Sequence, residues 1–370
     1  MYNITLRLAL ALLLAVAAPV AVAQVSAPDM LLKGVTADVI AIIRQDKDVQ
    51  AGVPGTQVSL SRVGVTGVEK VLRVRNNGAE HLYYAELECF VDLNPQQAGV
   101  HMSRFEEVVA EVIDEVVLGE AFRAETLASH IAERVRERQD GLRAEVSVAA
   151  RYPETVSTPE SGKSTQEIYT LFGTAVSSER GTRTLRGVQA QGMTACPCAQ
   201  EMVTGQARER LQERGFDEEE IEQVFEAVPV ATHNQRGIGT LHVGCPEGGP
   251  AWIDAPELLR IVESSMSSEI YELMKRPDEL AVVEKAHAQP RFVEDCVREM
   301  VRQVVEGYPE LPADAFVMAR QENLETIHRH NVVAERYGLV GELSGELDSG
   351  EHSHHHVSMR EWLEQTGQTG

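Results

Sequence analysis

The stretch QVSLSRVGVTGVEKVLRV (57–74), together with HLYYAELECFVDL (81–93), decides the fold class. Both runs are rich in β-branched and aromatic residues, and the intervening NNG is a typical turn, so the sequence predicts an antiparallel hairpin. Apolar residues at helical spacing follow in 103–122, and a second helix is predicted over 125–139. Strands over 142–152 and 167–178 complete the first half.

The second half of the chain roughly repeats this order. Strand-like runs occupy 184–195 and 238–244, helical runs occupy 255–276 and 290–308, and a strand with a polar end covers 315–327. Paired strands with grouped helices predict an α+β protein of two modules, over 53–182 and 183–347. The charged segment 203–228 reads as a helical insertion broken at Gly215, and 348–370 as a His-rich acidic tail.

Composition restricts the class of protein. The chain has 370 residues, with 57 acidic against 34 basic, and its net charge of −23 argues against binding to nucleic acid or anionic membranes. Five scattered cysteines do not form the framework of a secreted disulfide protein. Residues 1–23 nevertheless have the pattern of a signal peptide, and 24–52 read as a foreign-looking helical extension.

The motif MTACPCAQEM (193–202) raises the question of metal chemistry, because Cys196 and Cys198 flank a single proline. A disulfide between them would close a small, strained ring, and no second pair of ligands follows at the spacing of a structural zinc site. An open site with one thiolate, one imidazole and one carboxylate remains. The candidates lie in ATHNQRG (231–237), in KRPDE (275–279), read as the end of a helix, and in NLETIHRHN (323–331).

Seven blocks in fixed order carry a family resemblance. They are VGVTGVEK, HMSRFEE, MTACPCAQ, ATHNQRG, ELMKRPDE, FVEDCVREM and ENLETIHRHN, spread over about 55–345. The set resembles the metal-dependent GTP cyclohydrolases of type IB and, more specifically, their archaeal MptA branch. This resemblance implies a tunnelling fold (T-fold) with two modules per subunit, a homotetramer or dimer, and a cytoplasmic location, with which the signal-peptide-like segment conflicts.

The resemblance also implies a reaction. Metal-activated water adds to C8 of GTP, the imidazole ring opens, and C8 leaves as formate. Ring closure then gives 7,8-dihydroneopterin 2′,3′-cyclic phosphate, the first step of methanopterin- and folate-type pterin biosynthesis; in the type IB alternative the product is dihydroneopterin triphosphate. One divalent ion per site is expected, Fe²⁺ first and Zn²⁺ or Mn²⁺ as alternatives, since a thiolate ligand disfavours Mg²⁺.

Residue roles follow from matching the motifs one by one. The resemblance places the metal ligands at Cys196, His233 and Glu279, with Cys196 also in the catalytic group. It matches His328 to the catalytic histidine and Glu294 to the carboxylate that holds the guanine edge. Further candidates for substrate contacts are basic side chains of the same blocks: Arg236, Lys275 and Arg276 for the triphosphate, then His101 and Arg104.

Two other functions are compatible with parts of the sequence. One keeps the T-fold and changes the chemistry to another pterin or purine enzyme, such as a 7-deazaguanine-pathway amidohydrolase or reductase. The other is a periplasmic lipid-binding protein, because residues 1–52 resemble the start of Mla-type phospholipid-binding proteins. The mass of the product formed from GTP distinguishes the first alternative from a GTP cyclohydrolase. Lipid that co-purifies with the chain would support the second alternative.

Overall fold

The computed structural model describes residues 50–76, 79–115, 123–246, 253–350 and 354–365. The signal-peptide-like segment, most of the predicted extension and the last two residues of the NNG turn therefore lie outside the described residues. The described chain divides into two compact units, one of residues 50–58 with 95–99 and one of 59–94 with 100–365. In the small unit, the carbonyls of Gln50 and Gly52 accept hydrogen bonds from the backbone N–H groups of Gly99 and Ala98.

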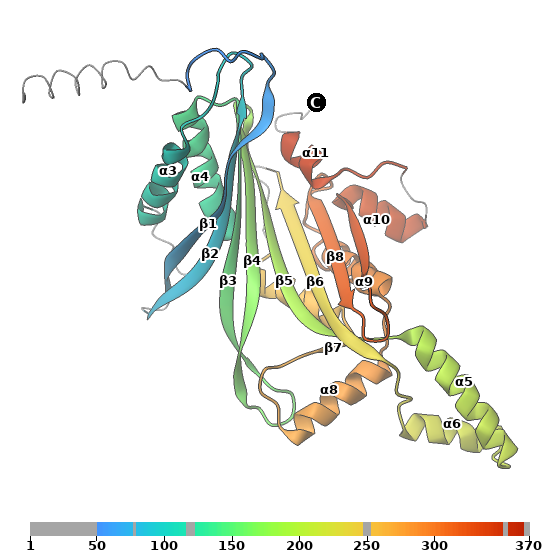
Figure 1. Cartoon of the computed structure of the whole chain (residues 1–370). Coiled ribbons are helices and arrows are strands. Elements are labelled where there is room, and N and C mark those ends of the chain that lie inside the picture. Colours follow the sequence, from blue (N-terminus) through green and yellow to red (C-terminus); the bar gives the residue numbers. More distant parts are fainter. Residues whose placement is uncertain (1–49, 77–78, 116–122, 247–252, 351–353, 366–370) are drawn as a thin grey trace, which may run out of the picture. The chain divides into compact units, whose positions relative to one another are not determined.

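The large unit combines long strands with helices (Figure 1). Its first elements are β1 (Leu60–Asn76), β2 (Ala79–Leu93), α3 (Met102–Glu115), α4 (Ala124–Gln139), β3 (Arg143–Ser157) and β4 (Ser164–Ser178). The middle elements are β5 (Gly181–Ala195), α5 (Pro197–Glu213), α6 (Glu218–Ala227), β6 (Asn234–Cys245), α7 (Ala255–Ser264) and β7 (Ser268–Glu269). The last are α8 (Arg276–Ala288), α9 (Val293–Gly307), β8 (Phe316–Leu324), β9 (Val332–Leu339), α10 (Val340–Ser349) and α11 (Met359–Glu364).

The described strands form one antiparallel sheet in the order β1–β2–β3–β4–β5–β6–β8–β9, and the short β7 pairs with β5. The predicted hairpin is confirmed, since Leu60 pairs with Leu93 and the ladder continues to Asn76 and Ala79. Alternate residues of the strands are buried, as in the row Ala144, Val146, Val148 and Ala150 of β3. Helices α3, α4, α7 and α9 supply the other side of this core.

The α+β class is therefore confirmed. The order strand, strand, helix, helix, strand, strand of the first half recurs in β5, β6, α7, α9, β8 and β9, once the additional elements α5, α6, β7 and α8 are set aside. The sheet runs without interruption through the turn between β4 and β5, where Ser178 pairs with Gly181. The division into two modules at 182 stays a prediction. No helix of the described residues combines the length and the apolar character needed to cross a membrane.

Three local predictions need correction. The helix predicted over 255–276 ends at Ser264, and the chain then bends into β7 before α8 begins at Arg276. KRPDE (275–279) therefore starts a helix and does not end one. The insertion is helical as predicted, but it begins at Pro197, directly after Cys196, and forms the two helices α5 and α6 on either side of Gly215 (Figure 1).

The C-terminal tail is more ordered than its polar composition suggests. Helix α11 buries Trp362 completely, and its indole N–H donates to the Asp314 carbonyl at 2.8 Å. Arg183 lies over the Trp362 ring and donates to its carbonyl, while Phe316 packs beside the ring. The polar tail therefore contains an anchoring helix, which the predicted tail lacked.

Candidate active site

Cys196 and His233 lie side by side at the end of the β5–β6 ladder. The last ladder pair joins Ala195 to Asn234, and just beyond it the Cys196 N–H donates to the His233 carbonyl at 3.1 Å. The Thr232 hydroxyl donates to the Cys196 carbonyl at 3.0 Å. Two of the three predicted metal ligands are thus neighbours, although 36 residues separate them along the chain.

The surroundings of both side chains fix their orientation and suit the forms in which they would bind a metal ion. Cys196 is the N-cap of α5, and its Sγ accepts the Ala199 N–H at 3.5 Å. A helix N-terminus favours an anionic group, which a thiolate is. His233 Nδ1 lies 3.1 Å from Gln235 Oε1; when Nδ1 donates this bond, Nε2 presents its lone pair to a ligand. Cys196 and Cys198 are free thiols, as expected.

Gln200 ties the base of the α5–α6 hairpin together. Its Nε2 donates at 2.7 Å to the carbonyls of both Val230 and His287. His287, near the end of α8, also places Nε2 3.3 Å from the Thr232 carbonyl. Both ends of the insertion are therefore fixed to α8, so the insertion leaves and re-enters the fold without separating Cys196 from His233.

The loop that contains His328 reaches the same end of the sheet. β8 pairs with β6 up to Leu324, opposite Arg236, and the Thr326 hydroxyl donates to the Asn234 carbonyl at 3.1 Å. The exposed rings of His328 and His330 stack with their centroids 5.2 Å apart. The predicted catalytic histidine is therefore on a surface loop that is anchored to the residue following His233.

Glu294 is linked to this region through Arg291 and a serine-rich loop. The Arg291 N–H donates to the Ala195 carbonyl at 3.0 Å, and its guanidinium donates to the Ser265 carbonyl at 3.1 Å. The Ala195 N–H in turn donates to Ser267 Oγ at 3.1 Å. These hydrogen bonds form a clamp between Ala195, the loop 265–267 and Arg291. Glu294 is exposed in the first turn of α9, three residues after Arg291, and is therefore held near the residue that precedes Cys196.

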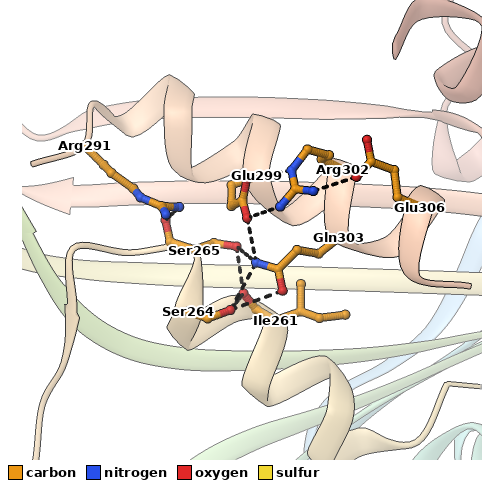
Figure 2. A network of polar contacts seen from close by, with 8 residues as sticks. All are labelled: Ile261, Ser264, Ser265, Arg291, Glu299, Arg302, Gln303 and Glu306. Carbon is orange, nitrogen blue, oxygen red and sulfur yellow. Dashed lines mark hydrogen bonds and ion pairs between the residues drawn. The ribbon is translucent and has the colours of Figure 1, made fainter. Parts of the chain in front are cut away.

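Figure 2 shows how this clamp continues into α9. Gln303 Nε2 donates to Ser264 Oγ at 3.1 Å and to Glu299 Oε1 at 3.0 Å. Glu299 pairs with Arg302, and the neighbouring guanidinium holds the pKa of Glu299 below its usual range. The end of α7 and the face of α9 are therefore joined by a polar network next to the candidate site.

Glu279, the third predicted metal ligand, lies elsewhere on the chain. It is exposed in the first turn of α8 and precedes His287 by eight residues, about 12 Å along a helix that rises about 1.5 Å per residue. The described residues of one chain contain no group of three His, Cys, Asp or Glu side chains that could hold a metal ion. Within one chain, the predicted ligands Cys196 and His233 are thus neighbours, and the predicted carboxylate lies apart from them.

Asp278, next to Glu279, has a structural role that the sequence did not indicate. Its carboxylate accepts hydrogen bonds from the Ser161 hydroxyl at 2.6 Å and from the backbone N–H groups of Glu160, Ser161 and Lys275. Burial alone would raise the pKa of Asp278, but these bonds outweigh it and hold the pKa below its usual range. Asp278 therefore fixes the start of α8 to the β3–β4 loop.

His101 and Arg104 are at the other end of the sheet. The His101 carbonyl accepts from Gln139, and Arg104 donates to the Arg138 carbonyl, so both residues adjoin the end of α4. The chain continues from that end of α4 into β3. The first residue of β3, Arg143, pairs with Ser178, which in turn pairs with Gly181 at the start of β5. β5 spans 15 residues, about 50 Å at about 3.3 Å per residue, before it reaches Cys196. Within one chain, these residues do not join the Cys196–His233 pair.

A cavity of about 620 Å³ lies beside the ladder end, between β4, β5 and the segment 270–272. Gln235 and Arg236 line the cavity. Lys275 and Arg276 come three and four residues after Glu272, the last lining residue of the segment 270–272. Inside, the Tyr169 hydroxyl donates to Glu263 Oε1 at 2.7 Å. Burial raises the pKa of Glu263 to about 7, and nearby carboxylates add to the shift. Nothing in the sequence pattern singled out this pair.

Comparison with known proteins identifies the family. The family model described as type I GTP cyclohydrolase folE2 matches residues 47–334, which include the whole candidate site. The chain belongs to this family of GTP cyclohydrolases.

Individual relatives agree. GTP cyclohydrolase MptA of Methanococcus aeolicus is 41% identical over 307 residues, which is 81% of this chain and 99% of that protein. The MptA proteins of Methanocaldococcus jannaschii and Methanothermobacter thermautotrophicus are 40% and 42% identical over 81% of this chain, and over 97% and 96% of their own. Among solved structures, uricases from Bacillus fastidious and Arthrobacter globiformis give TM-scores of 0.45 and 0.44. Their identities are 9% and 11%, over 81% of this chain and 99% and 98% of theirs.

Proposed function

We propose that the protein opens the imidazole ring of GTP by hydrolysis, releases C8 as formate, and yields 7,8-dihydroneopterin 2′,3′-cyclic phosphate for pterin biosynthesis. Family membership and the relatives named GTP cyclohydrolase MptA support the cyclohydrolase class, and the cyclic product is what the resemblance of the sequence motifs implies. GTP as substrate supports a cytoplasmic location. The recurrence of the strand–helix order in both halves supports a two-module T-fold.

The site is proposed to hold one divalent metal ion, Fe²⁺ first. Cys196 and His233 fit this role, because the sulfur caps a helix and the ring is oriented by Gln235. A bound ion of this kind supplies Lewis-acid activation of water near neutral pH. A thiolate and an imidazole suit Fe²⁺ or Zn²⁺ better than Mg²⁺.

The third ligand is proposed to be Glu279 of a neighbouring copy of the chain. Glu279 is exposed at the start of α8, about 12 Å along the helix from the turn that contacts the Cys196–His233 segment. An exposed carboxylate in the first helical turn is available to another subunit. This arrangement makes a homo-oligomer, a tetramer or a dimer, necessary for the complete site.

The remaining candidates have roles that their positions support. Glu294 can accept the N1–H and 2-amino protons of guanine with its two oxygens. His328, on an exposed loop anchored at Asn234, can exchange protons with the opened ring. Arg236 lines the cavity beside the pair and can attract the triphosphate.

The observation that carries the proposal is the backbone hydrogen bond between Cys196 and His233 at the end of one ladder, within the family match. Its test is anaerobic incubation of the purified protein with Fe²⁺ and GTP. We expect formate release and, after oxidation, a fluorescent pterin. The Cys196→Ala variant should lose at least about 100-fold in rate, because a metal ligand is gone.

The neighbouring thiol provides a matched control. Cys198 is exposed two residues away, so Cys198→Ser should keep close to wild-type formate release. Equal activity of the Cys196→Ala and wild-type proteins would contradict the proposal. The mass of the product decides between the cyclic phosphate and dihydroneopterin triphosphate.

A further inference from the structure

The cavity next to the candidate site exists because two neighbouring strands separate. β4 and β5 pair from Ser178 and Gly181 only as far as Thr170 and Gln189. Beyond that point β5 pairs instead with β7, through Gly192 and Met193. The space between the strands is the cavity of about 620 Å³, a size typical of small-molecule sites.

The inner wall of the cavity carries a carboxyl group on a rigid support. Glu263 is in the last turn of α7, and its Oε1 accepts the Tyr169 hydroxyl at 2.7 Å. Tyr169 is 6% exposed, so its ring is held by packing and its hydroxyl fixes the orientation of the carboxyl. One oxygen of Glu263 is thus engaged, while the second can accept from a ligand.

At the wall that carries Glu263, the charges around the cavity favour the nucleoside end of a nucleotide over its phosphates. Glu167, Glu263 and Glu272 line the cavity, so a polyphosphate is repelled from this wall. Arg151 and Arg236 also line it and can attract the phosphates. A nucleoside with hydrogen-bond donors toward Glu263 and phosphates toward the arginines satisfies both sets of charges.

We propose that Glu263, positioned by Tyr169, is a substrate-recognition residue that accepts hydrogen bonds from the nucleoside part of GTP in this cavity. The inference rests on the proposed function and adds a recognition point that no motif indicated. Since Glu294 is already proposed to accept the N1–H and 2-amino protons of guanine, the donors left for Glu263 are the ribose hydroxyls. A carboxylate oxygen accepts hydrogen bonds from such O–H groups.

The test measures nucleotide binding without turnover, by titrating GTP, ITP and 2′-deoxyGTP into the full-length protein after removal of metal. Glu263→Gln keeps the shape of the side chain and should weaken GTP binding about 10-fold or more, because hydrogen bonds to a charged group are lost. Tyr169→Phe should show a smaller effect of the same kind. Glu257→Gln, which removes an exposed carboxyl of the same helix outside the cavity, should bind as the wild type does.

The analogues identify the contact. If Glu263 accepts from the ribose, the effect of Glu263→Gln should shrink with 2′-deoxyGTP and persist with ITP, which lacks only the 2-amino group. Wild-type affinity of Glu263→Gln for GTP, or an equal loss for all three nucleotides, would overturn this inference alone. A wild-type protein that binds none of the nucleotides would overturn it together with the proposed function.

Discussion

Single hydrogen bonds decide how the candidate site residues face. Gln235 orients the ring of His233, and Ala199 donates to the sulfur of Cys196, so each prospective ligand has one partner that fixes its direction. Such outer partners matter nearly as much as the ligands themselves, and their loss typically costs about 10–100-fold in metal affinity or activity. The residue scale is therefore where the chemistry of this protein is set.

Glu263 should make stability fall as the pH rises. Its pKa is raised to about 7 in the folded protein, so between the ordinary value near 4.5 and 7 the folded state binds more protons than the unfolded state. The free energy of unfolding should therefore decrease from pH 5 to pH 8, by up to about 3 kcal/mol from this group. Urea titrations of the wild type and Glu263→Gln across this range should show a weaker decrease in the variant. Parallel curves would contradict this expectation.

The residues that sequence could identify are those in motifs. Cys196 and His233 were predicted as metal ligands, which stays a prediction; the structure shows a backbone hydrogen bond between the two residues. Glu263 and Tyr169 were missed because they are 94 positions apart and meet only when α7 packs beside β4. No local pattern of residue types encodes such a pairing.

At the scale of elements, a glycine determines how closely α4 approaches the sheet. A Cβ on Gly173 of β4 would lie 2.1 Å from the backbone carbon of Ala124 at the start of α4. Gly173→Ala should therefore lower the free energy of unfolding by about 1–3 kcal/mol, measured by urea titration with circular dichroism. Gly205→Ala in α5 is the control: it meets no atom within 4 Å and should leave stability unchanged or raise it by up to about 1 kcal/mol. Similar losses in both variants would refute the packing argument.

The clamp between β5 and α9 gives a second prediction at this scale. In a Cys198→Ser background, the remaining cysteines besides Cys196 are buried, so alkylation reports on Cys196. Arg291→Gln loses the bond to the Ser265 carbonyl and should loosen the segment before Cys196, which raises its alkylation rate several-fold. Arg298→Gln, which removes only an exposed pair with Asp295, should leave the rate unchanged. Equal rates in all three proteins would show that Arg291 does not position this segment.

Helix boundaries show where reading the sequence failed. KRPDE was read as a helix end because of its two cations, but proline is favoured in a first turn, and Asp278 and Glu279 follow it at the positive end of the helix dipole. The proline and the two acidic residues already indicated a helix start, but the two cations were given more weight. By contrast, the burial of Ser265, Ser267 and Ser268 depends on partners from β5, α7 and α9, which the serines themselves do not reveal.

At the scale of the whole molecule, one chain holds only part of the predicted site. Cys196 and His233 are at one end of the sheet, His101 is near the other, and Glu279 lies apart on α8. The sequence could predict the α+β class and the motif residues, because these depend on local patterns. It could not predict which of them one chain brings together, because that depends on the path of the sheet.

The decisive measurement is formate release from GTP by oligomers in which Cys196→Ala and Glu279→Ala chains are co-expressed and purified together. Each variant alone should be inactive. If the site combines Cys196 and His233 of one chain with Glu279 of another, random mixing leaves about a quarter of the sites intact and should restore about that fraction of wild-type activity. No activity above that of the separate variants, or full activity of Glu279→Ala alone, would contradict this shared site.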